Sequence, residues 1–376
     1  MDATTTPRTD WAALAAHLGP SFAEREATLD AEDRFAAENI SDLKAHRVYA
    51  AAVPAELGGG NATMAELSTL LRGLARYAPA TALALSMHTH SVAALAWRWR
   101  HQSAPVDTLL RRVATEQCVI LTSGGNDWLD SGGTATRAEG GYRINARKGF
   151  ASGQPAGDLL MTSAVLDDPI AGPTVLHFMV PVSAQGVRAL DTWKTLGMRS
   201  SASNDILLED VFVPEAAIAG RRPKGVWHPM IHVAASVAFP LVYSVYAGVA
   251  EAARDLAIRA VPENARLDPL VQMAAGALDT TLATARMAVA DMVIASGEPS
   301  GPETTSRIMT GRQIAGTAAI RTVELALDLA GGRGFFRAAG LERLFRDIQA
   351  ARYHALKTTD QQVLAGRLAL GVPIDD

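Results

Sequence analysis

The segment TSGGNDWLDSGGTATRAEGGYRINARKGFASGQPAGDLL, residues 122–160, decides the fold of the middle of the chain. A Gly-rich turn leads into two strand-like runs and then into a second turn of small residues. Backbone amides and hydroxyls exposed in such turns can hold a planar polar ligand. The segment therefore predicts a β domain that carries a small-molecule site.

The composition of the chain changes on both sides of this segment. Ala, Leu and Glu dominate up to residue 115, and the breakers there gather in VPAELGGGNAT, residues 53–63, which indicates a loop between helical hairpins. Runs rich in Val, Thr and Ile, such as TVLHFMVPV and DILLEDVFVPE, predict a β-barrel or sandwich. After AIAGRRPKG a helical pattern returns in four long blocks, which is typical of an antiparallel bundle. We therefore expect an α+β chain with an N-terminal α-helical domain (1–115), a middle β-barrel domain (116–220) and a C-terminal four-helix bundle (221–376).

Composition narrows the class of partner. The chain has 376 residues, is 48% hydrophobic and carries a net charge of −4 with no long run of one sign, so a nucleic acid or an anionic membrane is not expected as the main partner. Its one cysteine, Cys118, excludes an internal disulfide, and no metal-ligand spacing stands out, so we expect no metal. Residues 1–19 lack the basic and apolar regions of a secretory signal. We expect a cytoplasmic protein with a small-molecule ligand.

One apolar stretch is long enough to cross a bilayer, because residues 226–250 contain no Lys, Arg, Asp or Glu. His228, His232, Pro240 and several serines interrupt it, and it runs directly into the charged EAARDLAIRA. A helix that is apolar all round is also what the centre of a bundle requires. We interpret the stretch as a core helix.

Phe150 and Ser152 are the first candidate ligand contacts. They alternate along one expected strand and so project from the same face, which would place a ring and a hydroxyl beside an isoalloxazine. Spacing alone is equally met by a turn serine next to a core phenylalanine. No Gly-x-Gly-x-x-Gly fingerprint or phosphate loop offers another nucleotide site.

Several motifs, in the right order, resemble those of the acyl-CoA dehydrogenase superfamily over nearly the whole chain. VPAELGGG is similar to the family's Val-Pro-x-x-x-Gly-Gly loop, and Thr122 opens a degenerate Thr-Glu-Pro segment in which Ser123 and Gly124 replace Glu and Pro. The strand at Lys148 resembles the flavin-contacting Lys-x-Trp-Ile-Thr motif. LGMRSSASNDILLEDVFVPE (196–215), LDLAGGRGFF (327–336) and LERLFRDIQAARYH (341–354) match further family segments.

This resemblance implies a bound flavin, FAD or FMN, and a homodimer or homotetramer. The residues it places at the cofactor are Thr122, Phe150, Ser152, Gly331, Gly332 and Gly334.

The chain departs from the family where a dehydrogenase carries its catalytic base. The usual glutamate position falls on Ala355, and the alternative position on the first bundle helix falls at residues 235–238, which contain no carboxylate. The Arg-x-x-Phe-Gly motif that helps to hold FAD is replaced by VPENARLDPL. Without a base, removal of an acyl α-proton has no obvious agent.

These departures resemble the branch that uses reduced flavin and oxygen, such as dibenzothiophene monooxygenase. The resemblance assigns catalytic roles to His88, Ser152 and His354 as hydrogen-bond donors in a site that excludes water. His88 lies on an apolar stripe with Leu85, whereas His90 points roughly the opposite way, so His88 is favoured. The simpler interpretations are a satisfied core histidine for His88 and a solvated surface histidine for His354.

The sequence is compatible with three functions. The first is a reduced-flavin monooxygenase that acts on a small hydrophobic substrate, with a flavin reductase as partner. The second is an acyl-CoA or acyl-carrier-protein dehydrogenase whose base has moved. The third is a non-catalytic binding protein on the same scaffold.

Overall fold

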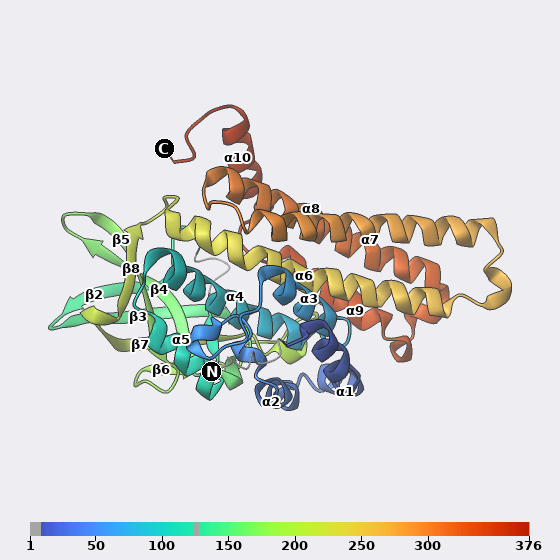
Figure 1. Ribbon diagram of the computed structural model, residues 1–376, viewed down its shortest axis with the longest axis horizontal. Helices are drawn as coiled ribbons and strands as arrows, with labels where there is room; N and C mark the ends of the chain where they lie inside the picture. The colour runs from blue at the N-terminus through green and yellow to red at the C-terminus, as the bar shows by residue number, and fades with distance from the viewer. Residues whose placement is uncertain (1–8, 124–127, 376) are drawn as a thin grey trace, which may run out of the picture.

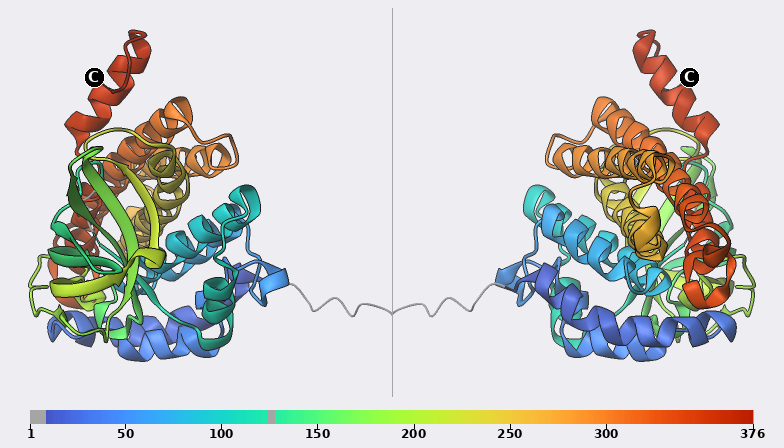
Figure 2. Two further views of the ribbon diagram at one scale, coloured as in Figure 1. Left: turned by 90° about the vertical axis from the view of Figure 1, so that its left-hand side faces the viewer. Right: turned by 90° about the vertical axis from the view of Figure 1, so that its right-hand side faces the viewer.

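The computed structural model describes residues 9–123 and 128–375. The strands gather at one end of the molecule, the N-terminal helices lie along one side, and the long C-terminal helices reach away from the sheet (Figure 1). Turned by 90°, the view shows the N-terminal helices below and the C-terminal helices above (Figure 2). The order of helices, sheet and helices along the chain is the one predicted from its composition.

The N-terminal helices have well-defined starts. The side chain of Asp10 accepts a hydrogen bond from the backbone nitrogen of Ala13 at 2.9 Å, which caps the first helix. Thr63 and Glu66 form a capping box at the third helix, directly after the glycine-rich loop. The helices are α1 (Trp11–Ala31), α2 (Ala37–Ala45), α3 (Met64–Ala75), α4 (Pro79–Gln102) and α5 (Asp107–Glu116).

The middle domain is one mixed eight-stranded sheet. Its strands are β1 (Ile120–Thr122), β2 (Thr134–Ala138), β3 (Gly141–Ala151), β4 (Leu159–Asp168), β5 (Gly172–Pro181), β6 (Val187–Ala189), β7 (Asn204–Pro214) and β8 (Ile218–Pro223). The strand order is β6-β7-β3-β2-β4-β5-β8, and β1 pairs in parallel with β4. Within the described residues the ladders form a path that begins at β6 and ends at β8.

Three helices of the C-terminal domain are long, and the fourth expected block is divided. The long helices are α6 (Pro229–Ala260), α7 (Pro269–Ala295) and α8 (Pro302–Ala330), and the last block forms α9 (Leu341–Ile348) and α10 (Thr358–Ala369). Between α9 and α10, the carbonyls of Ala351 and His354 accept side-chain hydrogen bonds from Tyr243 and Arg312. Tertiary contacts therefore satisfy backbone groups that a continuous helix would pair internally.

Helix α6 is the core of this domain and contains the uncharged stretch. It packs against α3, α4, α7, α8 and α9. Its most apolar window has a mean hydropathy of 1.7 and is 94% buried inside the protein. Packing on all sides therefore accounts for its composition, as predicted for a bundle core.

Candidate active site

A cavity of about 190 Å³ lies where the three parts of the chain meet. Its lining comes from α4, from β1 and the turns of the sheet domain, from α6, and from the segment between α9 and α10. Aromatic rings and small hydroxyl side chains dominate, and no Lys, Arg, Asp or Glu is among the described residues that line it. The cavity is smaller than the roughly 300–1,000 Å³ typical of ligand pockets.

Phe150 and Ser152 both line this cavity, together with Thr122. The pairing of β3 with β7 shifts register between Lys148 and Ala151, and Phe150 has a φ of +61°. The two side chains reach the cavity because of this bulge, whereas the sequence suggested simple alternation along a regular strand. Phe150 is 47% exposed and packs edge-on against Trp193, with ring centroids 6.0 Å apart.

Ser152 belongs to a chain of hydroxyls that the sequence motifs did not identify. Ser203, which also lines the cavity, donates to Ser152 Oγ at 2.8 Å, and Ser201 and Ser203 are hydrogen-bonded at 2.7 Å. All three serines are buried. Because Ser152 Oγ accepts from Ser203, its own O–H remains to donate to a ligand. The serine-rich run at residues 200–203 was the available signal.

His354 and Tyr246 also line the cavity. Their side chains are hydrogen-bonded through Tyr246 Oη and His354 Nε2. Burial raises the pKa of Tyr246 well above its usual range, so the phenol stays protonated and donates to Nε2. Burial, followed by the charge of Arg312 and by His90, lowers the pKa of His354 to about 3. The ring is therefore neutral, and the hydrogen bond assigns its proton to Nδ1.

The sequence favoured His88 over His90 as a residue of the site, and the structure places them the other way round. His90 lines the cavity, and burial together with His88 lowers its pKa to about 4. His88 does not reach the cavity: its Nε2 donates to the carbonyl of Tyr49 at 2.8 Å, and its Nδ1 accepts from the nitrogen of Ile120 at 3.0 Å. Both ring nitrogens of His88 serve the backbone, so it is a core histidine that ties α4 to β1.

The glycine turn after α8 is also away from the cavity. Gly331, Gly332 and Gly334 lie in a 3₁₀ turn that follows Ala330, and none of them lines the site. Gly331 has a φ of +58°, which explains the need for glycine there. Gly124 lies outside the described residues.

The position that the resemblance gives to the usual base, and one residue of the 235–238 region that it gives to the alternative base, face the cavity. Ala355 follows His354 in its wall, and Ala238 contributes from α6. Neither carries a carboxylate, and the ionisable groups among the described lining residues are two tyrosines, Tyr246 and Tyr353, and the two neutral histidines, His90 and His354. The arrangement can donate hydrogen bonds to an oxygen-rich group, but it offers no described acid to remove a carbon-bound proton.

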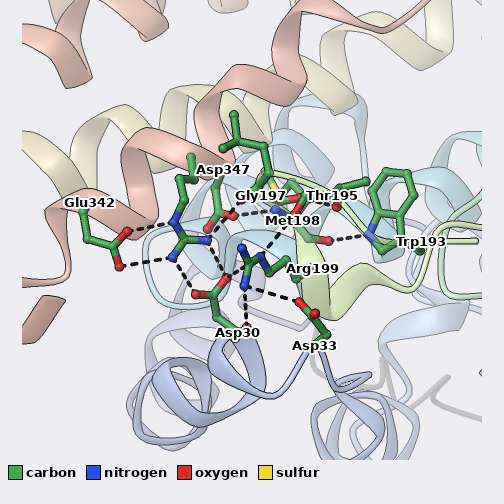
Figure 3. Close-up of polar contacts among 11 residues, drawn as sticks. Asp30, Asp33, Trp193, Thr195, Gly197, Met198, Arg199, Glu342 and Asp347 are labelled. Carbon is green, nitrogen blue, oxygen red and sulfur yellow. Dashed lines mark hydrogen bonds and ion pairs between the residues drawn. The ribbon is translucent and has the colours of Figure 1, made fainter.

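The aromatic wall is held by a polar network between three elements. Trp193 lines the cavity and donates its indole N–H to the carbonyl of Met198 at 3.0 Å. The nitrogen of Met198 donates to Asp347 on α9, and Arg346 pairs with Asp30 of α1 at 2.6 Å (Figure 3). Helices from both ends of the chain therefore fix the loop that carries Trp193.

Two family models match the chain: "Acyl-CoA dehydrogenase, N-terminal domain" over residues 13–101 and "Acyl-CoA dehydrogenase, C-terminal domain" over residues 241–358. A solved structure of KijD3 in complex with FMN and an amino-sugar nucleotide has a TM-score of 0.87 and 26% identity, and the match covers 100% of this chain and 98% of that one.

Two curated relatives match most of the chain. A pigment production hydroxylase from Rhodococcus sp. is 27% identical, with 96% of each chain covered. The putative acyl-CoA dehydrogenase YdbM from Bacillus subtilis is 25% identical, with 92% of each chain covered. The two family models together match more than half of the sequence, and the cavity lies between the regions they cover and the sheet. The chain belongs to the acyl-CoA dehydrogenase superfamily.

Proposed function

We propose that this chain is a flavin-dependent monooxygenase that uses reduced FMN or FAD and oxygen to oxygenate a small hydrophobic substrate. One observation carries the proposal. Ala355, where the resemblance places the usual base, and Ala238, within residues 235–238 where it places the alternative base, both line the cavity, and no described carboxylate does. Oxygen transfer from a flavin needs no such base, whereas α,β-dehydrogenation does.

The lining fits a flavin ring. Phe150 and Trp193 supply aromatic surface, and Thr122, Ser123 and Ser152 supply hydroxyls for its polar edge. The relative KijD3 was solved with FMN. When bound and reduced, the flavin would supply the electrons that activate oxygen.

The chain's own residues would provide hydrogen bonds and exclude water. Ser152 has an O–H to donate, since its oxygen already accepts from Ser203. His354 has its Nδ1 proton to donate, since Nε2 accepts from Tyr246. Both donors lie in a site walled by aromatic rings, where hydrogen bonds to a negatively charged oxygen are stronger than in water.

The part of the cavity lined by α4 and α6 carries several apolar side chains, and we propose that the substrate binds there. Leu83 and Met87 of α4 and Phe239 and Val242 of α6 line it, and no described charged side chain does. A charged group placed there would lose its hydration without a partner. The lining therefore favours a neutral, hydrophobic reacting group.

The experiment is an anaerobic mixing measurement. The purified protein is loaded with photoreduced FMN or FAD, mixed rapidly with oxygenated buffer, and followed by absorbance. A transient spectrum that differs from both oxidised and reduced flavin, and that lasts longer than with free flavin, supports the proposal. Direct reoxidation at the rate of free flavin contradicts it, and failure to bind either flavin supports a non-catalytic binding protein.

A dehydrogenase remains the second candidate because the similar protein YdbM is described as a putative acyl-CoA dehydrogenase. It would require a base outside the described lining. Bleaching of the oxidised flavin by an acyl-CoA or an acyl-carrier-protein thioester under anaerobic conditions would favour it over oxygenation.

The surroundings of the enzyme are also part of the proposal. We place it in the cytoplasm with a separate flavin reductase as supplier of reduced cofactor. Exposed apolar side chains support assembly into a homodimer or homotetramer. Those on and beside α7 are Leu267, Leu270, Met273, Met287 and Ile294. Phe335 and Phe336, at the glycine turn, are exposed as well. A second copy would be needed to bring Gly331, Gly332 and Gly334 to a flavin.

A further inference from the structure

Arg312 of α8 lies directly behind the His354 wall of the cavity. Its side chain is buried, with 2% exposed, and its Nη2 donates to the carbonyl of His354 at 2.5 Å. The other guanidinium nitrogens, Nε and Nη1, are buried without a hydrogen-bond partner among the described residues. Within residues 9–123 and 128–375, Arg312 also forms no ion pair. The chain thus keeps a full positive charge in its interior with a backbone carbonyl and the Tyr243 side chain, rather than a carboxylate, as its partners.

Such a charge is costly to bury, because a guanidinium taken out of water normally needs an anionic partner. Two aromatic faces offset part of the cost: the guanidinium carbon lies 5.6 Å from the ring centre of Tyr243 and 5.9 Å from that of Phe239. Phe239 itself lines the cavity. An apolar residue of similar length could fill the same space, so packing alone does not account for an arginine here.

A second hydrogen bond acts on the same segment. Tyr243 Oη donates to the carbonyl of Ala351 at 2.8 Å, and the Tyr243 ring meets the His354 ring edge-on with centroids 6.1 Å apart. Arg312 and Tyr243 therefore bind two carbonyls, three residues apart, in the segment that follows the end of α9 at Ile348. These contacts fix the backbone from which the His354 ring reaches Tyr246.

We propose that Arg312 is a positioning residue: it fixes the backbone of His354 so that the ring meets Tyr246 and the cavity, and it places a positive charge beside that ring. The inference rests on the proposed function only for the use to which His354 is put. The geometry of the clamp is independent of the reaction.

The groups that face His354 support the second half of the inference. Tyr243 and Tyr246 approach from α6, His90 from α4 and Arg312 from α8. Of these, only Arg312 is charged at neutral pH, since the tyrosines have raised pKa values and His90 a lowered one. Burial is the first cause of the low pKa of His354, and the Arg312 charge is the second.

The test is a titration of His354 in the full-length protein by NMR of ¹⁵N-labelled histidine rings, assigned with His354→Gln. Arg312→Met removes the charge and the hydrogen bond, and we expect the pKa of His354 to rise by about one unit or more, with loss of the Nε2 shift caused by Tyr246. Arg312→Lys keeps a charge on a shorter side chain that cannot reach the carbonyl of His354 in the same geometry, so the pKa should stay low while the hydrogen bond to the backbone is weakened. Arg321→Met, an exposed change on the same helix next to Glu324, is the matched control.

A folded Arg312→Met protein with the wild-type titration and the wild-type Nε2 shift would overturn the inference. If Arg312→Met does not fold, hydrogen exchange of residues 349–357 decides in Arg312→Lys: faster exchange than in the control supports the clamp, and equal exchange refutes it. These readouts need no turnover. If the wild-type protein shows no oxygen chemistry but His354 responds as described, the proposed function fails and the positioning role stands.

Discussion

Asp347 accepts a hydrogen bond from the backbone nitrogen of Met198 at 2.5 Å, across the boundary between α9 and the sheet domain (Figure 3). The carboxylate is buried, and burial raises its pKa to about 6 despite the hydrogen bond from Met198. The carbonyl of the same Met198 accepts from the indole of Trp193 in the cavity wall. One backbone unit therefore links α9 to the aromatic side of the site.

Asp347→Ala should destabilise the fold and disturb the cavity together. It leaves the Met198 nitrogen buried and unpaired, which typically costs about 1–3 kcal/mol. Urea unfolding should report the loss of stability, and the binding of FMN should weaken because Met198, whose carbonyl anchors Trp193, is no longer held in place. Asp347→Asn retains an acceptor oxygen and should behave more like the wild type. Equal effects of Ala and Asn would show that the charge, rather than the hydrogen bond, matters.

Glu26 of α1 makes the stability of the protein depend on pH. Its side chain is 1% exposed, Oε1 has no partner among the described residues, and burial raises its pKa from 4.5 to about 8. Because the folded state holds this proton more tightly than the unfolded state, its contribution to stability is complete below pH 4.5 and is lost as the pH rises to 8.

Glu26→Gln should therefore raise the melting temperature at pH 9 far more than at pH 5. Each unit of pKa shift corresponds to about 1.4 kcal/mol. The gain in free energy of unfolding from Glu26→Gln should therefore be several kcal/mol larger at pH 9 than at pH 5. Melting curves at pH 5, 7 and 9 measure it, with Glu24→Gln as an exposed control on the same helix. A Glu26→Gln effect that is independent of pH would mean that the wild-type carboxyl is ionised when folded.

The sequence located the cavity wall best where residues could be aligned with a family motif. Phe150 and Ser152 line the cavity, and so does Ala355, the residue at the vacant glutamate position. The order of helical and β regions followed from composition, because residue types that suit each structure are clustered along the chain.

The remaining parts of the site depend on contacts that no local pattern records. Helical phase placed His88 and His90 on opposite faces, but it could not tell which face meets the cavity. Tyr246 and His354 are 108 residues apart, and Ser152 and Ser203 are 51 apart. Such pairs are set by how segments far apart in the sequence pack within a domain, so their partners become visible only in the fold.

The two histidines of α4 should separate stability from function. His88→Gln cannot satisfy Tyr49 and Ile120 with the same geometry, and it should lower the melting temperature while a folded fraction still binds FMN. His90→Gln should leave the melting temperature nearly unchanged and shorten the transient flavin spectrum after mixing with oxygen, because His90 lines the cavity. Equal changes in melting temperature would contradict this division.

Tyr246→Phe should uncouple oxygen consumption from oxygen transfer. The ring remains, but His354 Nε2 loses its donor, and the Nδ1 proton is no longer fixed. Loss of a positioned proton donor typically slows such a step by about a hundredfold or more. Hydrogen peroxide released per reduced FMN should rise, as it should in His354→Ala, whereas the remote Tyr77→Phe should behave as wild type.

Because the pKa of His354 is about 3, the hydrogen peroxide released per reduced FMN by the wild-type protein should show no step between pH 5 and 8.

Ser152→Ala and Ser203→Ala should not act independently. Ser152→Ala removes the proposed donor to the flavin or to its bound oxygen, and a lost hydrogen bond of about 0.5–1.5 kcal/mol corresponds to a roughly 2- to 12-fold weaker interaction. Ser203→Ala should produce a smaller change, since it acts by orienting the Ser152 hydroxyl at 2.8 Å. If the hydroxyls work as a chain, the double variant should resemble Ser152→Ala alone. Dissociation constants for FMN and FAD and the lifetime of the transient spectrum measure this cycle, with the exposed Ser183→Ala as control. Additive effects of the two substitutions would show that Ser203 contacts the ligand in its own right.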